Sequence, residues 1–148
     1  MVSTPSFDPN MFANDDGDEY IDSLRDDHAK PFMNKVIEGL YPPGSTFKIV
    51  VALAALEAGA ITPQEKIYCP GYWDYGDRRY HCWEHDGHGK MNLSDALKHS
   101  CDIYFYQVAL RIGIDAIKEM AIKLGLTEKY MNDILSREMA GVMPDRYW

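Results

Sequence analysis

The segment YPPGSTFKIVVALAALEAG, residues 41–59, organises the sequence on either side of it. Its opening Tyr41-Pro42-Pro43-Gly44 is a strong turn signal, because proline and glycine interrupt helices. The apolar run that follows contains only Lys48 and Glu57 as charges, and it predicts a helix over residues 45–59 that stops at Gly59. A helix that is apolar on all sides is buried, so we expect other elements to surround it.

The composition sets limits on size and partners. The chain has 148 residues, about one domain, and 46% of them are hydrophobic. Its 15 lysines and arginines against 23 acidic residues give a net charge of −8, and such a field repels phosphates, so we expect no nucleic-acid partner. No apolar run reaches the roughly 18 residues that a membrane span needs, and no secretory signal is recognisable.

The segments outside residues 41–59 predict mainly helices and one hairpin. Residues 1–34 contain three prolines and are expected to be irregular, apart from a short helix or turn at 19–27. Residues 67–83 predict a β-hairpin with its turn at Tyr75-Gly76, followed by a loop at 84–91. Further helices are predicted at 93–98, 103–112, 114–124 and within 128–148. Gly113 ends the helix at 103–112, and Gly125 ends the helix at 114–124.

Ser45 and Lys48 are the first candidates for chemistry. Their spacing of three residues places both side chains on one face of the predicted helix start. A serine hydroxyl becomes a nucleophile when a base takes its proton, and a desolvated lysine amine can be that base. The alternative is that Ser45 only caps the helix, which is a favoured position for serine. Capping leaves Lys48 unexplained, because helix starts favour an acidic residue three positions on.

Ser100 and Asp102 are the second candidates, on either side of Cys101 between two predicted helices. Side chains two residues apart point the same way where the backbone is extended, so the two can act together. The alternative is an ordinary loop that caps the helix beginning at Ile103.

Taken together, these motifs resemble those of class B penicillin-binding proteins of the elongation type. The resemblance rests on YPPGSTFK at 41–48 and LEAG at 56–59, on STPSFDPN at 3–10, and on GHG at 87–89, SCDIYFY at 100–106, GID at 113–115 and GVMPDR at 141–146. It therefore covers nearly the whole chain. It implies an α+β fold, namely the mostly helical lobe of a β-lactamase/transpeptidase-like domain, truncated before the C-terminal sheet strands.

The same resemblance implies a peptidoglycan D,D-transpeptidase that works by serine acylation. Carried over by position, Ser45 is the nucleophile and Lys48 its proton acceptor, Ser100 relays protons toward the leaving group, and Asp102 holds Lys48 and the substrate amide. Asp102 stands where many relatives have asparagine, so its role leans toward orienting the lysine. No K-T-G box occurs in the sequence, so we expect this 148-residue piece to be inactive by itself.

The implied ligands and location follow from the resemblance as well. The substrates are stem peptides ending in D-Ala-D-Ala, and the inhibitors are β-lactams. The implied partners are membrane proteins of the elongation machinery, and the implied location is the periplasmic side of the bacterial inner membrane, with the anchor outside this sequence. The competing hypothesis is a zinc-stabilised helical interaction module without catalysis.

A zinc site is the remaining prediction. The three cysteines are an odd number, so they cannot all form internal disulfides, whereas three thiolates and one imidazole form a tetrahedral shell suited to Zn²⁺. The sequence alone does not choose among four neighbouring histidines. The resemblance selects one, because some elongation-type relatives carry zinc near the active site on matching positions, with carboxylates in place of two of the thiolates. The predicted ligands of this structural zinc are Cys69, Cys82, His88 and Cys101.

A disulfide is the chief rival of the zinc site. Cys69 and Cys82 are equally far from the predicted Tyr75-Gly76 turn, so the hairpin places them opposite each other. That arrangement accommodates a shared metal, and with slight adjustment it accommodates a disulfide in an oxidising compartment. The other alternative is three reduced, partly buried cysteines and a solvated histidine.

Overall fold

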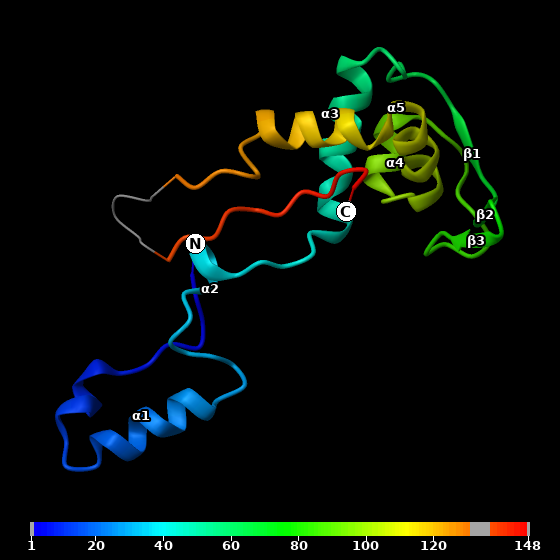
Figure 1. Ribbon diagram of the computed structural model, residues 1–148. Helices are drawn as coiled ribbons and strands as arrows, with labels where there is room; N and C mark the ends of the chain where they lie inside the picture. The colour runs from blue at the N-terminus through cyan, green and yellow to red at the C-terminus, as the bar shows by residue number, and fades with distance from the viewer. Residues whose placement is uncertain (1, 131–136, 148) are drawn as a thin grey trace. The chain divides into compact units, whose positions relative to one another are not determined.

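The computed structural model describes residues 2–130 and 137–147, and the chain divides into two compact units (Figure 1). The first unit combines residues 1–41 with 129–141, and the second combines 42–128 with 142–148. Among the described residues no helix is both long and apolar enough to cross a membrane. All four candidate catalytic residues and all four candidate metal ligands belong to the second unit.

The first unit contains the 3₁₀ turn η1 (Pro9–Ala13) and the helices α1 (Gly17–Asp26) and α2 (Lys35–Glu38). The short helix expected at 19–27 is therefore present as a ten-residue helix that begins two residues earlier. Residues 1–34 are less irregular than predicted, and a small cluster of partly exposed aromatic rings packs within this segment. Its ring centroids lie 5.0–6.3 Å apart and belong to Phe7, Phe12 and Phe32.

The predicted central helix is observed as α3 (Lys48–Glu57), preceded by the 3₁₀ turn η2 (Gly44–Phe47). Its end is a Schellman motif, because Gly59 N–H donates to the Leu56 carbonyl and Ala60 N–H to the Ala55 carbonyl. Gly59 takes the positive φ of 63° that this motif requires. The helix is buried on one side only, because an exposed apolar stripe remains on Ile49, Leu53 and Leu56.

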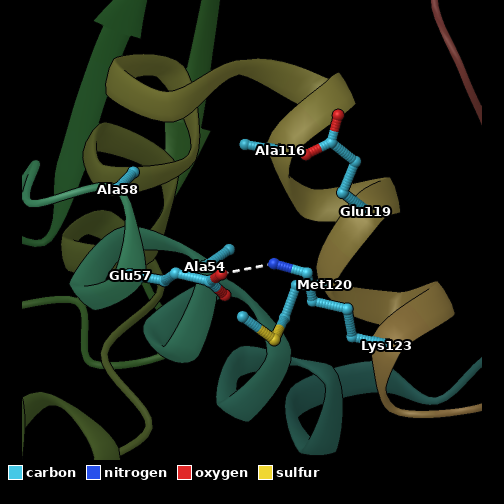
Figure 2. A pocket seen from close by; sticks show the side chains of 7 residues that line it. All are labelled: Ala54, Glu57, Ala58, Ala116, Glu119, Met120 and Lys123. Atoms are coloured by element: carbon cyan, nitrogen blue, oxygen red, sulfur yellow. Dashed lines mark hydrogen bonds and ion pairs between the residues drawn. The ribbon is translucent and has the colours of Figure 1, made fainter.

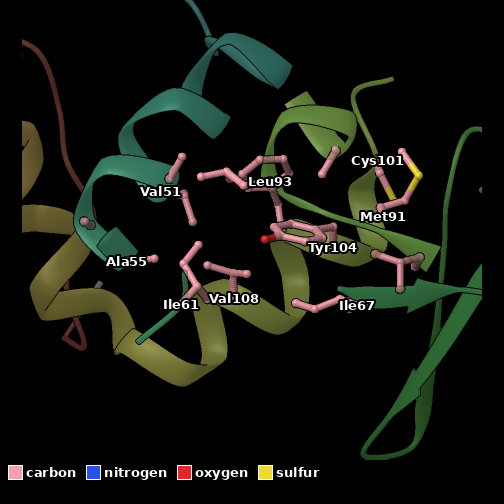
Figure 3. Packing of buried hydrophobic residues seen from close by; sticks show 14 of the residues in the cluster. Val51, Ala55, Ile61, Ile67, Met91, Leu93, Cys101, Tyr104 and Val108 are labelled. Carbon is pink, nitrogen blue, oxygen red and sulfur yellow. The ribbon is translucent and has the colours of Figure 1, made fainter. Parts of the chain in front are cut away.

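Helix α5 (Asp102–Lys123) packs against α3 and passes across it in Figure 1. It is interrupted at Gly113, where φ is 76° and ψ is 167°, so the two predicted helices are confirmed as two helical halves of one element. The short α4 (Leu93–Lys98) has the predicted bounds, and the Asn92 side chain caps it by accepting from Asp95 N–H. Figure 3 shows the core between these helices, which contains Val51, Ala55, Leu93, Tyr104 and Val108.

The strands form two small antiparallel ribbons instead of the single hairpin predicted over 67–83. Strand β1 (Ile67–Cys69) pairs with β4 (Gly89–Met91), which lies inside the segment predicted to be a loop. Strands β2 (Tyr72–Tyr75) and β3 (Arg78–His81) form the true hairpin.

The predicted position of the hairpin turn is wrong by one residue. Tyr75 pairs with Arg78, so the turn residues are Gly76 and Asp77 rather than Tyr75 and Gly76. The physical reason is the positive φ of 62° at Gly76, which occupies the first turn position, where glycine is favoured. The helix expected within 128–148 falls partly on residues 131–136, outside the described residues, and 137–147 form no helix.

Candidate active site

Lys48 is held at the first turn of α3 by three oxygen atoms from one distant segment. Its Nζ donates to Asp102 Oδ1 at 2.6 Å, to the Ser100 carbonyl at 2.8 Å and to Ser100 Oγ at 3.0 Å. Nζ also lies 5.9 Å from the centre of the Phe105 ring. The Lys48 and Asp102 side chains are only 12% and 21% exposed, so water screens this ion pair weakly.

The backbone between α4 and α5 explains how Ser100 presents two oxygens to one amine. Ser100 adopts a left-handed φ of 50°, which is uncommon for a residue other than glycine. Asp102 then opens α5 in its first turn. Both residues therefore accept hydrogen bonds from Lys48, and no side chain caps the start of α5.

Ser45 lies within η2, one turn before Lys48, and its side chain is exposed. Its carbonyl accepts the Lys48 N–H, but its hydroxyl has no hydrogen-bond partner in residues 2–130 and 137–147. The residue at the N-cap of α3 is Phe47, so Ser45 does not cap that helix. The alternative that Ser45 serves only as a helix cap is therefore wrong for α3.

The contact of Trp83 with this site was not predicted from the sequence. Its backbone N–H donates to Asp102 Oδ2 at 3.1 Å, and its indole Nε1 donates to the His99 carbonyl at 3.0 Å. The two carboxylate oxygens of Asp102 are therefore divided between Lys48 and Trp83. The only available signal was the position of Trp83 directly after a candidate metal ligand, Cys82.

The four predicted metal ligands gather in one place, with their ligand atoms all within 4.8 Å of one another. The three thiols are buried and form no disulfide. His88 turns Nδ1 toward the sulfur atoms, 3.5 Å from Cys82 Sγ and 3.8 Å from Cys69 Sγ. Cys69 and Cys82 are not cross-strand partners, because β1 pairs with β4 and Cys82 follows β3.

The chemistry of this cluster fits a cation. Burial is the main reason that the pKa of the Cys101 thiol is raised to about 12; the neighbouring Cys69 and Cys82 act in the same direction, and the Tyr104 backbone N–H opposes them. A bound cation reverses such an effect because it stabilises the thiolate. Nδ1 of His88 is the ring atom that faces the sulfur atoms, whereas Nε2 is buried without a hydrogen-bond partner among the described residues.

A cavity of about 130 Å³ lies elsewhere in the second unit, between α3 and α5 (Figure 2). Glu57 and Lys123, which form an ion pair, are among the residues that line it. None of the four candidate catalytic residues contributes to its wall, so this cavity is separate from the candidate site.

Comparison with known proteins defines the class of protein. The family model of the penicillin binding protein transpeptidase domain matches residues 1–148. The chain therefore belongs to the penicillin-binding protein transpeptidase family.

Individual relatives and solved structures show which members of this family the chain is similar to. The chain is 40% identical over 150 residues to the peptidoglycan D,D-transpeptidase MrdA of Escherichia coli K12, covering 100% of this chain and 24% of the relative. It thus spans about a quarter of that protein's length. It is also similar to the PBP2 structure of Pseudomonas aeruginosa, determined in complex with WCK 5153, with a TM-score of 0.89, 41% identity and coverage of 100% of this chain and 32% of that one.

Two further similar structures are complexes, one with a second protein and one with a β-lactam. The PBP2–MreC complex of Helicobacter pylori matches with a TM-score of 0.81 and 35% identity, over 88% of this chain and 24% of that one. The penicillin G acyl-enzyme complex of penicillin-binding protein A from Mycobacterium tuberculosis matches with a TM-score of 0.81 and 30% identity, and the match covers 97% of this chain and 35% of that one. The predicted α+β fold with a mostly helical lobe is confirmed by these neighbours.

Proposed function

We propose that the protein containing this chain is a peptidoglycan D,D-transpeptidase of the elongation type that acts through an acyl-enzyme on Ser45. The observation that carries the proposal is the triple hydrogen bond of Lys48 Nζ to Ser100 and Asp102, one turn from a free Ser45 hydroxyl. The name of the 40% identical relative supports the same activity. The competing hypothesis of an interaction module without catalysis is not favoured, because the whole chain matches the transpeptidase family.

The contacts suggest how each group works. Lys48 Nζ donates to Asp102 and Ser100, and in the proposed step it accepts the Ser45 proton. The Ser45 oxygen then attacks the carbonyl carbon of the penultimate D-Ala of a stem peptide, and the peptide bond to the terminal D-Ala breaks. Ser100, hydrogen-bonded to Lys48, passes the proton to the departing amine. The amine of a second stem peptide attacks the ester and restores the Ser45 hydroxyl.

Covalent labelling of the full-length protein by a fluorescent penicillin tests this proposal. Ser45→Ala should abolish labelling, and Lys48→Ala should slow it by about 10²–10⁴-fold, the usual contribution of a general base. Ser94→Ala is the matched control, because it removes an exposed hydroxyl from α4, outside the site. Labelling of the Ser45→Ala protein at the wild-type rate would show that another residue is the nucleophile.

The proposed substrates are stem peptides ending in D-Ala-D-Ala, with β-lactams as inhibitors that acylate the same serine. The penicillin G acyl-enzyme of a relative supports the second point. We propose action on the periplasmic side of the inner membrane, together with elongation-machinery proteins of the MreC type, as suggested by the Helicobacter pylori complex. Co-purification of the full-length protein with MreC from its own source tests the partner, and a protein that never co-purifies contradicts it.

We also propose a structural zinc on Cys69, Cys82, His88 and Cys101. The support is the convergence of three buried thiols and the Nδ1 atom of His88, whose other ring nitrogen has no hydrogen-bond partner among the described residues. A zinc there supplies structural cross-linking, because closed shells of cysteine and histidine contribute folding free energy. Cys101 lies between Ser100 and Asp102 in sequence, so its fixation holds the second catalytic segment in place.

Metal content and chelation test the zinc proposal. We expect one zinc per chain, lost together with cooperative unfolding, and a weaker affinity in Cys101→Ser. His85→Ala is the matched control, because His85 is exposed and lies outside the cluster. A metal-free protein whose melting curve is unchanged by chelator contradicts the site. Mass spectrometry of the non-reduced protein tests the rival hypothesis of a disulfide, since a bond between Cys69 and Cys82 lowers the mass by about two daltons.

A further inference from the structure

Four aromatic side chains form a continuous row from the hairpin to α5, which we call the aromatic ridge: Trp73, Tyr75, Tyr80 and Tyr106. The Trp73 and Tyr75 rings stack with centroids 5.1 Å apart, and Trp73 is the cross-strand partner of Tyr80. Tyr80 meets Tyr106 edge to face at 5.8 Å. Three of these residues share one face of the β2–β3 ribbon, because side chains alternate along a strand and cross-strand partners lie on the same side.

The ridge begins beside the candidate active site and ends in solvent. Tyr106 follows Asp102 by four residues, on the same face of α5. Burial raises the pKa of Tyr106, and the nearby Asp102 charge adds to this effect. At the other end Tyr75, next to the turn, is 52% exposed, while Trp73 packs against the core and anchors the row.

The ridge also carries one arginine without an acidic partner. The two arginines of β3 differ in this respect, because Arg79 forms a bidentate ion pair with Asp74 on the opposite face of the ribbon. Arg78, on the ridge face, lies over the Tyr80 ring at 5.4 Å and has no ion pair among the described residues. In a chain with a net charge of −8, an unneutralised cation at this place favours an anionic ligand.

We propose that the aromatic ridge binds a peptidoglycan strand and leads its stem peptide toward Ser45, an inference that rests on the proposed function. Pyranose rings present apolar C–H faces edged by hydroxyls, and tyrosine and tryptophan offer the matching combination of an apolar ring and a polar tip. The carboxylates of the stem peptides supply the charge that Arg78 attracts. The ridge therefore offers aromatic rings for the sugars and a cation for the carboxylates on one surface.

Binding to two probes tests the proposal with the purified full-length protein. The first probe is uncross-linked peptidoglycan strands with their stem peptides, and the second is the same strands after an amidase has removed the peptides. Tyr75→Ala should weaken binding to both probes by about 3- to 10-fold, as expected for one aromatic contact. Arg78→Ala should weaken binding by about 2- to 5-fold, and only to strands that carry peptides. Tyr75→Trp keeps an aromatic face and should retain binding.

Tyr68→Ala is the matched control, since Tyr68 is 60% exposed on β1 and is not part of the ridge. Penicillin labelling of Ser45, measured in the same samples, reports separately on the acylation mechanism and should be unchanged in the Tyr68→Ala control. Absence of labelling in the wild-type protein would disprove the acylation mechanism. Glycan binding by Tyr75→Ala is measured separately and tests the ridge alone. Unchanged binding of both probes by Tyr75→Ala overturns the proposal. Unchanged binding together with a lower melting temperature shows that the rest of the protein covers the ridge, and also overturns it.

Discussion

Replacing Asp102 by asparagine should destabilise the chain by about 2–3 kcal/mol. The carboxylate accepts from Lys48 Nζ at 2.6 Å and from Trp83 N–H at 3.1 Å, and a single amide oxygen cannot fully serve both. Hydrogen bonds to charged groups contribute about 1.5–3 kcal/mol, and both side chains of this pair are less than a quarter exposed. The two Ser100 oxygens remain on Lys48, which keeps the loss below that of an unpaired buried charge.

Urea unfolding followed by tryptophan fluorescence measures the effect. With a slope of about 1–3 kcal/mol per molar urea, the midpoint should fall by about 0.7–3 M. Asp74→Asn is the matched control, because it makes the same change in the exposed ion pair with Arg79 and should leave the midpoint nearly unaltered. A shift in Asp102→Asn no larger than that in the control would refute the reasoning, since the Lys48–Asp102 pair would then contribute no more than a surface pair.

Two further changes test other parts of the second unit. Tyr104→Phe should stabilise the chain by about 1 kcal/mol in the same assay, because the Tyr104 hydroxyl is buried with no hydrogen-bond partner among the described residues; a loss of stability would contradict this. The hydrogen bond from Lys118 lowers the pKa of Asp145 below its usual 3.8, so the pair stabilises the fold above that value and the contribution disappears as pH falls through the folded pKa. Asp145→Asn should therefore lower the urea midpoint at pH 7 but not at about pH 2, and an equal difference at both pH values would count against the pairing.

Local signals in the sequence predicted the helices well. Proline and glycine interrupt helices through their own backbone preferences, so the start near Gly44 and the stop at Gly59 needed no knowledge of the rest of the fold. The break at Gly113 is of the same kind, since its φ of 76° is accessible mainly to glycine. Burial was predicted less well, because periodicity shows which side chains are apolar and not which face another element covers.

The strands were harder because their pairing is not local. The partner of β1 is β4, about twenty residues further along the chain, and no pattern in either three-residue strand identifies the other. The predicted register placed the turn at Tyr75-Gly76, while the left-handed backbone of Gly76 moves it to Gly76-Asp77. The same error affected the reasoning about Cys69 and Cys82, which meet through two different ribbons rather than across one.

The candidate site also combines features that the local sequence predicts with contacts that depend on the fold. The roles proposed for Ser45 and Lys48 came from their spacing and from the resemblance, and the structure adds that Ser100 offers Lys48 its carbonyl as well as its hydroxyl. The backbone contact from Trp83 to Asp102 could not be predicted, because a main-chain donor leaves no trace in residue identity. Side-chain chemistry can be read from a sequence, whereas contacts made by the backbone require the fold.

The cysteine–histidine cluster and the segment Ser100–Asp102 are joined by covalent and hydrogen bonds of the chain itself. Cys82 precedes Trp83, Cys101 precedes Asp102, and the hydrogen bond from Trp83 N–H to Asp102 Oδ2 closes the connection between the two pairs. The indole of Trp83 adds a second link through the His99 carbonyl. Because these bonds use the backbone and fixed side chains, Asp102 is oriented toward Lys48 by the fold itself. A metal on the cluster would therefore add rigidity to an orientation that already exists, and its removal should lower stability before it changes the direction in which Asp102 points.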